Sequence, residues 1–107
     1  MKVNNAELAS LADRCFDLSM DGDVQPSDQK NFLVLGKRLR GSLVNLLTAE
    51  FQEGTQAVVN ANNQITTLNQ TISDATQVLN NTTQIINQIN QLVNILDDLL
   101  KIASNFK

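Results

Sequence analysis

The sequence contains no histidine, tryptophan or tyrosine, and it has only one cysteine and one proline among its 107 residues. Without histidine, the commonest general base and a frequent metal ligand are missing. The lone Cys15 can form no disulfide within the chain, and it falls in an apolar pattern that predicts a core residue. No paired carboxylates, nucleophile motif or phosphate-binding glycine loop is evident. We therefore expect no enzymatic activity, no metal and no cofactor.

An excess of one charge is also missing. Eight Lys and Arg residues stand against eleven Asp and Glu residues, and the formal net charge of −3 gives no overall attraction to nucleic acid or to an anionic membrane. The sequence has no apolar run of about 18 residues, and its first residues lack the apolar segment of a signal peptide. These absences favour a cytoplasmic location. Phenylalanine is the only aromatic residue and occurs four times, so the core must be aliphatic.

Two amphipathic segments open the chain. Residues 4–20 place apolar side chains at mostly three- and four-residue spacings, which predicts a helix that begins near Asn4 or Asn5. An Asp-Gly pair then predicts a turn. A second helix is expected over residues 27–53, with either Ser27 as its N-cap or Pro26 in its first turn. The apolar side of this helix carries Phe32, Leu35, Leu39, Leu43, Leu46 and Leu47.

An apolar seven-residue repeat runs through the rest of the chain. With Val44 as position a, all nine a positions are apolar, and among the nine d positions only Thr82 is polar and only Gly54 lacks a side chain. Nine heptads without a phase slip predict a coiled-coil or bundle helix over residues 55–105, with left-handed supercoiling. Gly54 either separates this helix from the second one or lies inside a continuous helix, and the unbroken register favours continuity.

The length of this apolar seam predicts an oligomer. A helix over residues 55–105 is about 75 Å long, and two shorter helices cannot cover its whole stripe. We therefore expect an all-α protein, a single helical domain over residues 1–107, in which two short helices precede a long helix that assembles with copies of itself. The number and direction of the chains stay open. The expected contact residues between chains are Ile65, Leu68, Ile72, Leu79, Ile86, Ile89, Val93, Leu96 and Leu100.

The surface of this segment is polar but nearly uncharged. Asp74 is the single charged residue between positions 66 and 96, and position e carries mostly Asn and Thr where two-stranded coiled coils carry Glu and Lys. Position g turns apolar from Val78 to Phe106, and a buried face of a, d and g suits three or four helices better than two. Assembly should depend little on salt. Asn/Gln-rich tracts can also form cross-β structure, but the spacings of three and four favour helix.

One concentrated positive patch is a candidate anion site. Lys37, Arg38 and Arg40 lie close to glycines and could contact phosphates of nucleic acid or lipid. Three cations without an aromatic platform are better interpreted as a solvated helix face balanced by nearby acids. The acidic stretch at 17–28 does not follow the spacing of a calcium-binding EF-hand loop, so an acidic turn is expected there.

These patterns lead to the interpretation of a non-enzymatic oligomeric scaffold or adaptor. Its expected partners are copies of itself and another protein, and residues 4–52 would cap the bundle or present the partner surface. The alternative is a regulator that binds a membrane surface or nucleic acid through the basic cluster at 37–40, although neither ligand is favoured by the net charge. A small enzyme has the least support. The partner and the biological process cannot be read from the sequence.

Overall fold

The computed structural model describes residues 1–105, with all side chains except those of Ala75, Ser104 and Asn105. The apolar g position at Phe106 lies outside the described residues. Within residues 1–105 every regular element is a helix, as the prediction of an all-α protein requires. In chain order these are α1 (Asn5–Ser19), α2 (Pro26–Leu46), α3 (Gln56–Ile72), α4 (Ala75–Asn80) and α5 (Thr82–Asn105).

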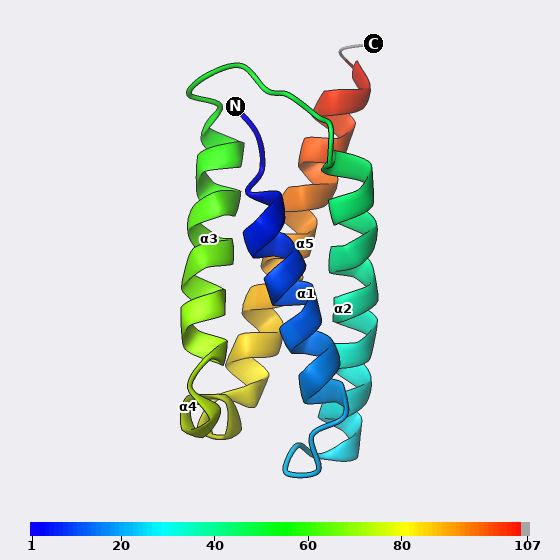
Figure 1. Cartoon of the computed structure of the whole chain (residues 1–107), viewed down its shortest axis with the longest axis vertical. Coiled ribbons are helices and arrows are strands. Elements are labelled where there is room, and N and C mark those ends of the chain that lie inside the picture. Colours follow the sequence, from blue (N-terminus) through cyan, green and yellow to red (C-terminus); the bar gives the residue numbers. More distant parts are fainter. Residues whose placement is uncertain (106–107) are drawn as a thin grey trace.

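The ends of α1 and α2 follow local signals in the sequence. Asn4 is the N-cap of α1, because its side-chain oxygen accepts a hydrogen bond from the N–H of Glu7 at 3.2 Å. α2 begins with Pro26 in its first turn, where the missing N–H of proline is tolerated. The two helices run antiparallel (Figure 1). Their buried apolar residues are Leu8, Leu11, Ala12 and Cys15 in α1 and Phe32, Leu35, Leu39 and Leu46 in α2.

The second helix is shorter than predicted, because α2 ends at Leu46 and not near residue 53. The irregular connection that follows crosses one end of the bundle (Figure 1). Within it Gly54 has a φ of +81°, a left-handed conformation that glycine adopts without the steric penalty of a Cβ. The expected helical continuity through Gly54 is therefore wrong. The first two seam positions, Val44 and Leu47, are exposed, so the seam does not extend back into α2.

The single long helix expected over residues 55–105 is also wrong, because the chain reverses direction around α4. The side chain of Asp74 accepts hydrogen bonds from the N–H groups of Thr76 at 3.0 Å and Gln77 at 3.3 Å, and so caps a new helix. In a continuous helix these N–H groups would bond to carbonyls one turn earlier. α5 then runs back antiparallel to α3 (Figure 1).

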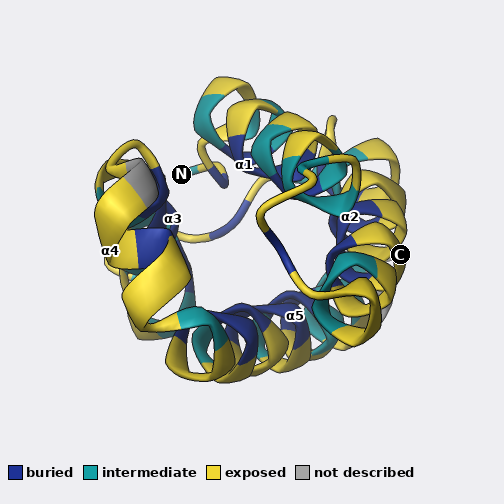
Figure 2. Ribbon diagram, turned by 90° about the horizontal axis from the view of Figure 1, so that it is seen from below, coloured by how far each residue is buried: buried dark blue, intermediate teal, exposed yellow. Residues whose placement is uncertain are grey.

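In the described part of the chain, four long helices surround one core and the short α4 lies at one end. α1 and α5 each contact both α2 and α3, so the helices form a ring in which α1 is opposite α5 (Figure 2). The connection from α2 to α3 crosses the diagonal of this ring, and therefore α1 runs parallel to α3 and α2 runs parallel to α5 (Figure 1). The molecule measures 44 × 20 × 19 Å, which excludes the extended rod that the heptad pattern predicted.

The apolar face predicted for the C-terminal segment is buried, but one chain covers it alone. In α5 the g, a and d side chains from Ile85 to Leu99 are buried, and in α3 so are the a and d side chains from Val58 to Ile72. The seam is not too long for one chain, because the reversal at α4 places its two halves against each other. Among the buried side chains of residues 1–103 only Phe32 and Phe51 are aromatic, in agreement with the predicted aliphatic core.

Two asparagines at e positions connect α3 to the N-terminal segment and α1. Asn62 accepts from the N–H of Asn4 at 2.7 Å and donates from Nδ2 to the carbonyl of Lys2 at 3.1 Å. One heptad later, the buried Asn69 donates from Nδ2 to the backbone carbonyl of Glu7 at 2.9 Å and to its carboxylate Oε2 at 2.8 Å. At Asn62 an amide suits better than Glu or Lys, because its two backbone partners are one donor and one acceptor.

Candidate interaction surface

The residues predicted to join two chains lie mostly inside this one. The structure buries Ile65, Leu68, Ile72, Ile86, Ile89, Val93 and Leu96, and it half-buries Leu100. Leu79 differs, because its side chain on α4 is 46% exposed. In this fold eight of the nine residues therefore form part of the intramolecular core and not a continuous outer surface.

The basic cluster lies on α2, and its members have different surroundings. Arg38 Nη2 is 3.4 Å from Asp97 Oδ2 on α5, and both side chains are about half exposed. Among residues 1–105, neither Lys37 nor Arg40 forms an ion pair, although both are exposed. Arg38 thus helps to connect α2 with α5, whereas the other two charges stay available at the surface.

Exposed aliphatic side chains lie beside these charges. Leu33, Val34 and Val44 are 38%, 50% and 67% exposed. At 3.6 residues per turn, these positions and Lys37 point away from the buried side of α2. We define the outer face of α2 as Leu33, Val34, Lys37, Gly41 and Val44. The exposed Lys30 lies on the same face one turn earlier, and the exposed Arg40 and Leu47 lie along one edge. Aliphatic and cationic side chains therefore share one exposed helix surface.

Gly41 lies at the centre of the outer face and has no packing role inside the fold. A Cβ at this position would have no heavy atom within 4 Å. Gly36 is different, since a Cβ there would lie 3.0–3.2 Å from ring carbons of Phe16 on α1. A glycine inside a helix costs about 1 kcal/mol relative to alanine, so Gly41 weakens α2 without a gain in internal packing. Its bare backbone does allow another molecule to approach closely.

The heptad register did not predict the aliphatic part of this face. It assigned Val44 to the buried seam, and it gave no role to Leu33 or Val34. A register drawn for α2 alone, from the spacing of Phe32 and Leu39, places these three residues on the opposite side of the helix. That local phase is the signal that could have revealed the outer face.

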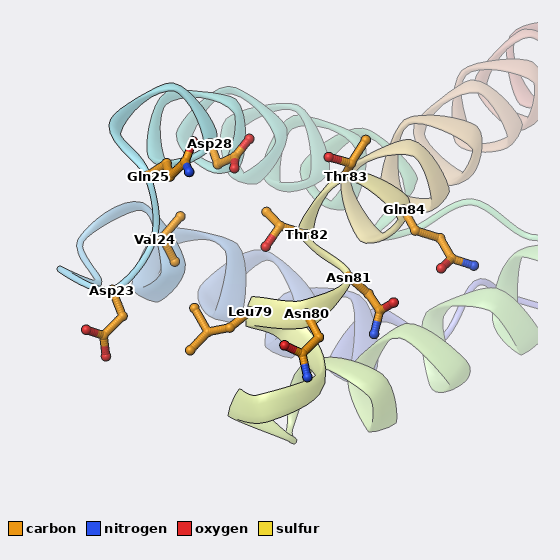
Figure 3. A pocket seen from close by; sticks show the side chains of 10 residues that line it. All are labelled: Asp23, Val24, Gln25, Asp28, Leu79, Asn80, Asn81, Thr82, Thr83 and Gln84. Atoms are coloured by element: carbon orange, nitrogen blue, oxygen red, sulfur yellow. The ribbon is translucent and has the colours of Figure 1, made fainter.

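A cleft of about 920 Å³ opens at the α4 end of the bundle (Figure 3). The turn between α1 and α2, with Asp23 and Val24, lines one side, and the segment from Leu79 to Gln84 lines the other. α4 contacts α3 and α5 but neither α1 nor α2. Within the described residues, no three His, Cys, Asp or Glu side chains are grouped so that they could hold a metal ion. The cleft thus marks α4 as the least covered helix of the fold.

Cys15 offers no reactive thiol. Its side chain is buried in the core, and burial raises its pKa from the ordinary value of 9.0 to about 12. The thiol is therefore protonated at neutral pH, whereas nucleophilic and metal-binding cysteines act as thiolates. The position predicted as a core residue is confirmed as one.

Two further findings bear on function. None of the helices in residues 1–105 combines the length and the apolar character needed to cross a bilayer. No family model, curated protein or solved structure matches this chain. The function therefore has to be inferred from the fold and from the outer face of α2.

Proposed function

We propose that this protein is a non-enzymatic adaptor that holds a helical segment of a partner protein on the outer face of α2. One observation carries the proposal, namely the exposed aliphatic stripe of α2 with cations beside it and Gly41 at its centre. Exposed apolar residues that follow one helix face are the usual counterpart of an amphipathic helix. Gly41 would allow the two helix backbones to cross at a short distance.

The charges of this face define the chemistry of the partner. Acidic side chains along the edges of the partner helix would pair with Lys30, Lys37 and Arg40, which adds specificity and speeds association. A second copy of α2 does not fit, because it would bring cations of the two copies together. We therefore infer an amphipathic helix with an apolar stripe and acidic edges.

A designed peptide tests this proposal. The probe is a fluorescent amphipathic helix with leucines at helical spacing and glutamates at its edges, and a peptide with lysines in place of the glutamates is the charge control. We expect the acidic peptide to bind at least about tenfold more tightly than the basic peptide in anisotropy titrations. Equal affinity of the two peptides, or no binding of either, would contradict the proposal.

Variants of the protein locate the binding site. Val44→Asp and Gly41→Leu should each weaken binding of the acidic peptide by about tenfold or more, because one adds a charge to the stripe and the other blocks close approach. Met20→Asp is the matched control, since Met20 is exposed but lies at the end of α1 that is remote from Val44 (Figure 1). Binding that survives Val44→Asp would place the peptide elsewhere.

We also propose that the adaptor forms homo-oligomers and acts in the cytoplasm, where a single buried thiol stays reduced. The seven-residue apolar repeat and the low charge of α3 and α5 support self-association, because copies that meet there do not repel each other. Size-exclusion chromatography with light scattering should return a mass above that of one chain. A single-chain mass across a wide concentration range would contradict this part of the proposal.

Binding to an anionic membrane surface is a second candidate function. Cationic and aliphatic side chains on one exposed helix are typical of helices that lie in the lipid interface. Lys37, Arg38 and Arg40 would supply the attraction to anionic headgroups or to other phosphates. Co-sedimentation with phosphatidylserine vesicles should then be salt-sensitive and should be lost in the variant Lys37→Gln/Arg38→Gln/Arg40→Gln. The same measurement with duplex DNA in place of vesicles tests whether these residues bind nucleic acid. Absence of binding at low salt would dismiss this candidate.

A further inference from the structure

The heptad register continues through the break between α3 and α5. Ile72 ends α3, Leu79 lies in α4 and Ile86 lies in α5, and these a positions keep the seven-residue spacing. Two helices joined by a turn do not need a common register, because the buried face of each is set by its own packing. A register shared by both helices and by the segment between them is what one continuous helix requires.

The break lies in residues 73–81, which we call the connector, and both local hydrogen bonds and the burial of Val78 stabilise it. Asp74 caps α4, and Asn81 Nδ2 donates to the carbonyl of Gln77 at 3.1 Å. The backbone of the connector helix comes close to neither α1 nor α2, and the cleft separates it from the turn between them (Figure 3). The side chains of Val78 and Leu79 reach towards α1, where they line one hollow with Leu18. Leu79, an a-position leucine, is left partly exposed beside this cleft. Straightening of the connector would move Val78 out of the core of its own chain. The side chains of Thr76, Gln77, Leu79 and Asn80 are already exposed and would lose little.

We propose that the connector straightens into helix and that two copies of this chain then exchange α5. α3, the connector and α5 would form one helix over residues 56–105, about 75 Å long at 1.5 Å per residue. Each α5 would take the place of its counterpart in the other copy, so that every core contact between Ile85 and Leu99 is kept. The inference rests on the self-association proposed above and specifies its mechanism, which is domain swapping.

The pairing of α3 with α5 indicates where the two long helices would meet. Gln64 and Thr67 of α3 line the same groove as Gln88 and Gln91 of α5. The midpoint of these pairs falls near residue 77, inside α4. In the exchanged dimer the two connectors would therefore run antiparallel past each other at a two-fold axis, and the leucine that each connector exposes would become buried. The dimer would present two outer faces of α2, one on each bundle.

A cross-link distinguishes exchange from surface association. The variant Gln64→Cys/Gln91→Cys is refolded from urea at high protein concentration, separated by size, treated with a short bis-maleimide and analysed on a denaturing gel. In one bundle the two thiols face the same groove, but in an exchanged dimer they belong to different chains. The dimer fraction should yield linked dimers and the monomer fraction internally linked monomers. Each single-cysteine variant controls for linkage at random, and the buried Cys15 stays unmodified.

Two connector variants should shift the equilibrium in opposite directions. Ala75→Pro places proline at the first residue of α4 after Asp74, whose ψ of 104° suits a residue before proline. The hairpin tolerates this proline and a continuous helix does not, so the dimer fraction should fall by about tenfold or more. Asn80→Ala/Asn81→Ala raises the helix propensity of the connector and should increase the dimer fraction. Circular dichroism of the monomer fractions shows whether each variant keeps its fold.

The outcomes separate this inference from the proposed function. Internal cross-links in the dimer fraction, or an unchanged dimer fraction in Ala75→Pro, would overturn exchange and leave self-association standing. A single-chain mass for every variant, Asn80→Ala/Asn81→Ala included, would overturn both. Linked dimers that disappear in Ala75→Pro support exchange, whatever the peptide titrations show.

Discussion

Replacement of the two glycines of α2 by alanine tests which of them the fold requires. At Gly41 an added methyl group meets free space, so helix propensity alone should stabilise the protein by about 0.5–1 kcal/mol and raise Tm by about 3 °C. At Gly36 the same gain is opposed by Phe16, whose Cε1, Cδ1 and Cζ lie 3.0, 3.1 and 3.2 Å from the position of the new Cβ. Overpacking costs about 1–3 kcal/mol, so the net change ranges from about zero to about 2 kcal/mol of destabilisation.

Urea denaturation followed by circular dichroism measures both effects at one low protein concentration. The free energies of unfolding of Gly41→Ala and Gly36→Ala should differ by about 1–3 kcal/mol. Phe16→Leu combined with Gly36→Ala should recover part of the loss, and a double-mutant cycle measures this coupling. If Gly36→Ala proved as stabilising as Gly41→Ala, the ring contact would not define how α1 packs on α2. If Gly41→Ala were destabilising, the fold itself would require Gly41, and the argument for a partner at this position would fail.

Three other predictions follow from single contacts. Burial raises the pKa of the Cys15 thiol to about 12, so the thiol of the unfolded chain loses its proton at lower pH than the folded one. Below pH 9.0 this group should not affect the free energy of unfolding. Above pH 9.0 the free energy of unfolding should fall by up to about 1.4 kcal/mol per pH unit towards pH 12. Urea titrations on either side of pH 9.0 should show this fall in the wild type and not in Cys15→Ala. Asn69→Asp removes both hydrogen bonds to Glu7 and adds a carboxylate beside it. The free energy of unfolding at neutral pH should therefore drop by about 1–3 kcal/mol and recover in part on acidification. An unchanged free energy of unfolding would contradict a stabilising contact between Asn69 and Glu7. Arg38→Gln breaks a half-exposed ion pair with Asp97 and should lower the free energy of unfolding by less than about 1 kcal/mol, and added salt should change this difference little. A larger loss of stability in thermal unfolding would mean that the ion pair is poorly solvated.

The sequence predicted helix faces more reliably than helix ends. The buried a, d and g positions of α5 and the N-cap at Asn4 agree with the pattern, because both depend on neighbours in the chain. The reversal at α4 could not be read from periodicity, since a hairpin that keeps its phase gives the same repeat as one long helix. A stop signal was present in Asp74, the only charged residue between positions 54 and 96. A cap of about 1 kcal/mol is a weak signal beside nine apolar heptads, and tertiary packing decided which prevailed.

The outer face of α2 was predicted only in its basic half. Lys37 and Arg40 fall on the polar side of the second helix by spacing alone, and they are exposed there. Val44 is exposed because α2 buries the side that carries Phe32 and Leu39, and the heptad register taken from α3 and α5 does not follow this phase. The two glycines were indistinguishable in the sequence, because only the position of Phe16 in space gives one of them an internal role.

The uneven placement of charge affects how fast a partner arrives. Residues 54–96 carry only Asp74, so most of the charged side chains of the molecule belong to α1, α2 and their connections. The exposed cations Lys30, Lys37 and Arg40 would attract an approaching acidic molecule before any contact forms and would turn it towards the outer face of α2. The rate constant for encounter should then decrease steeply with ionic strength while the rate of dissociation changes little. α3 and the part of α5 up to Leu96 carry no charged side chain, and collisions with them would be unproductive.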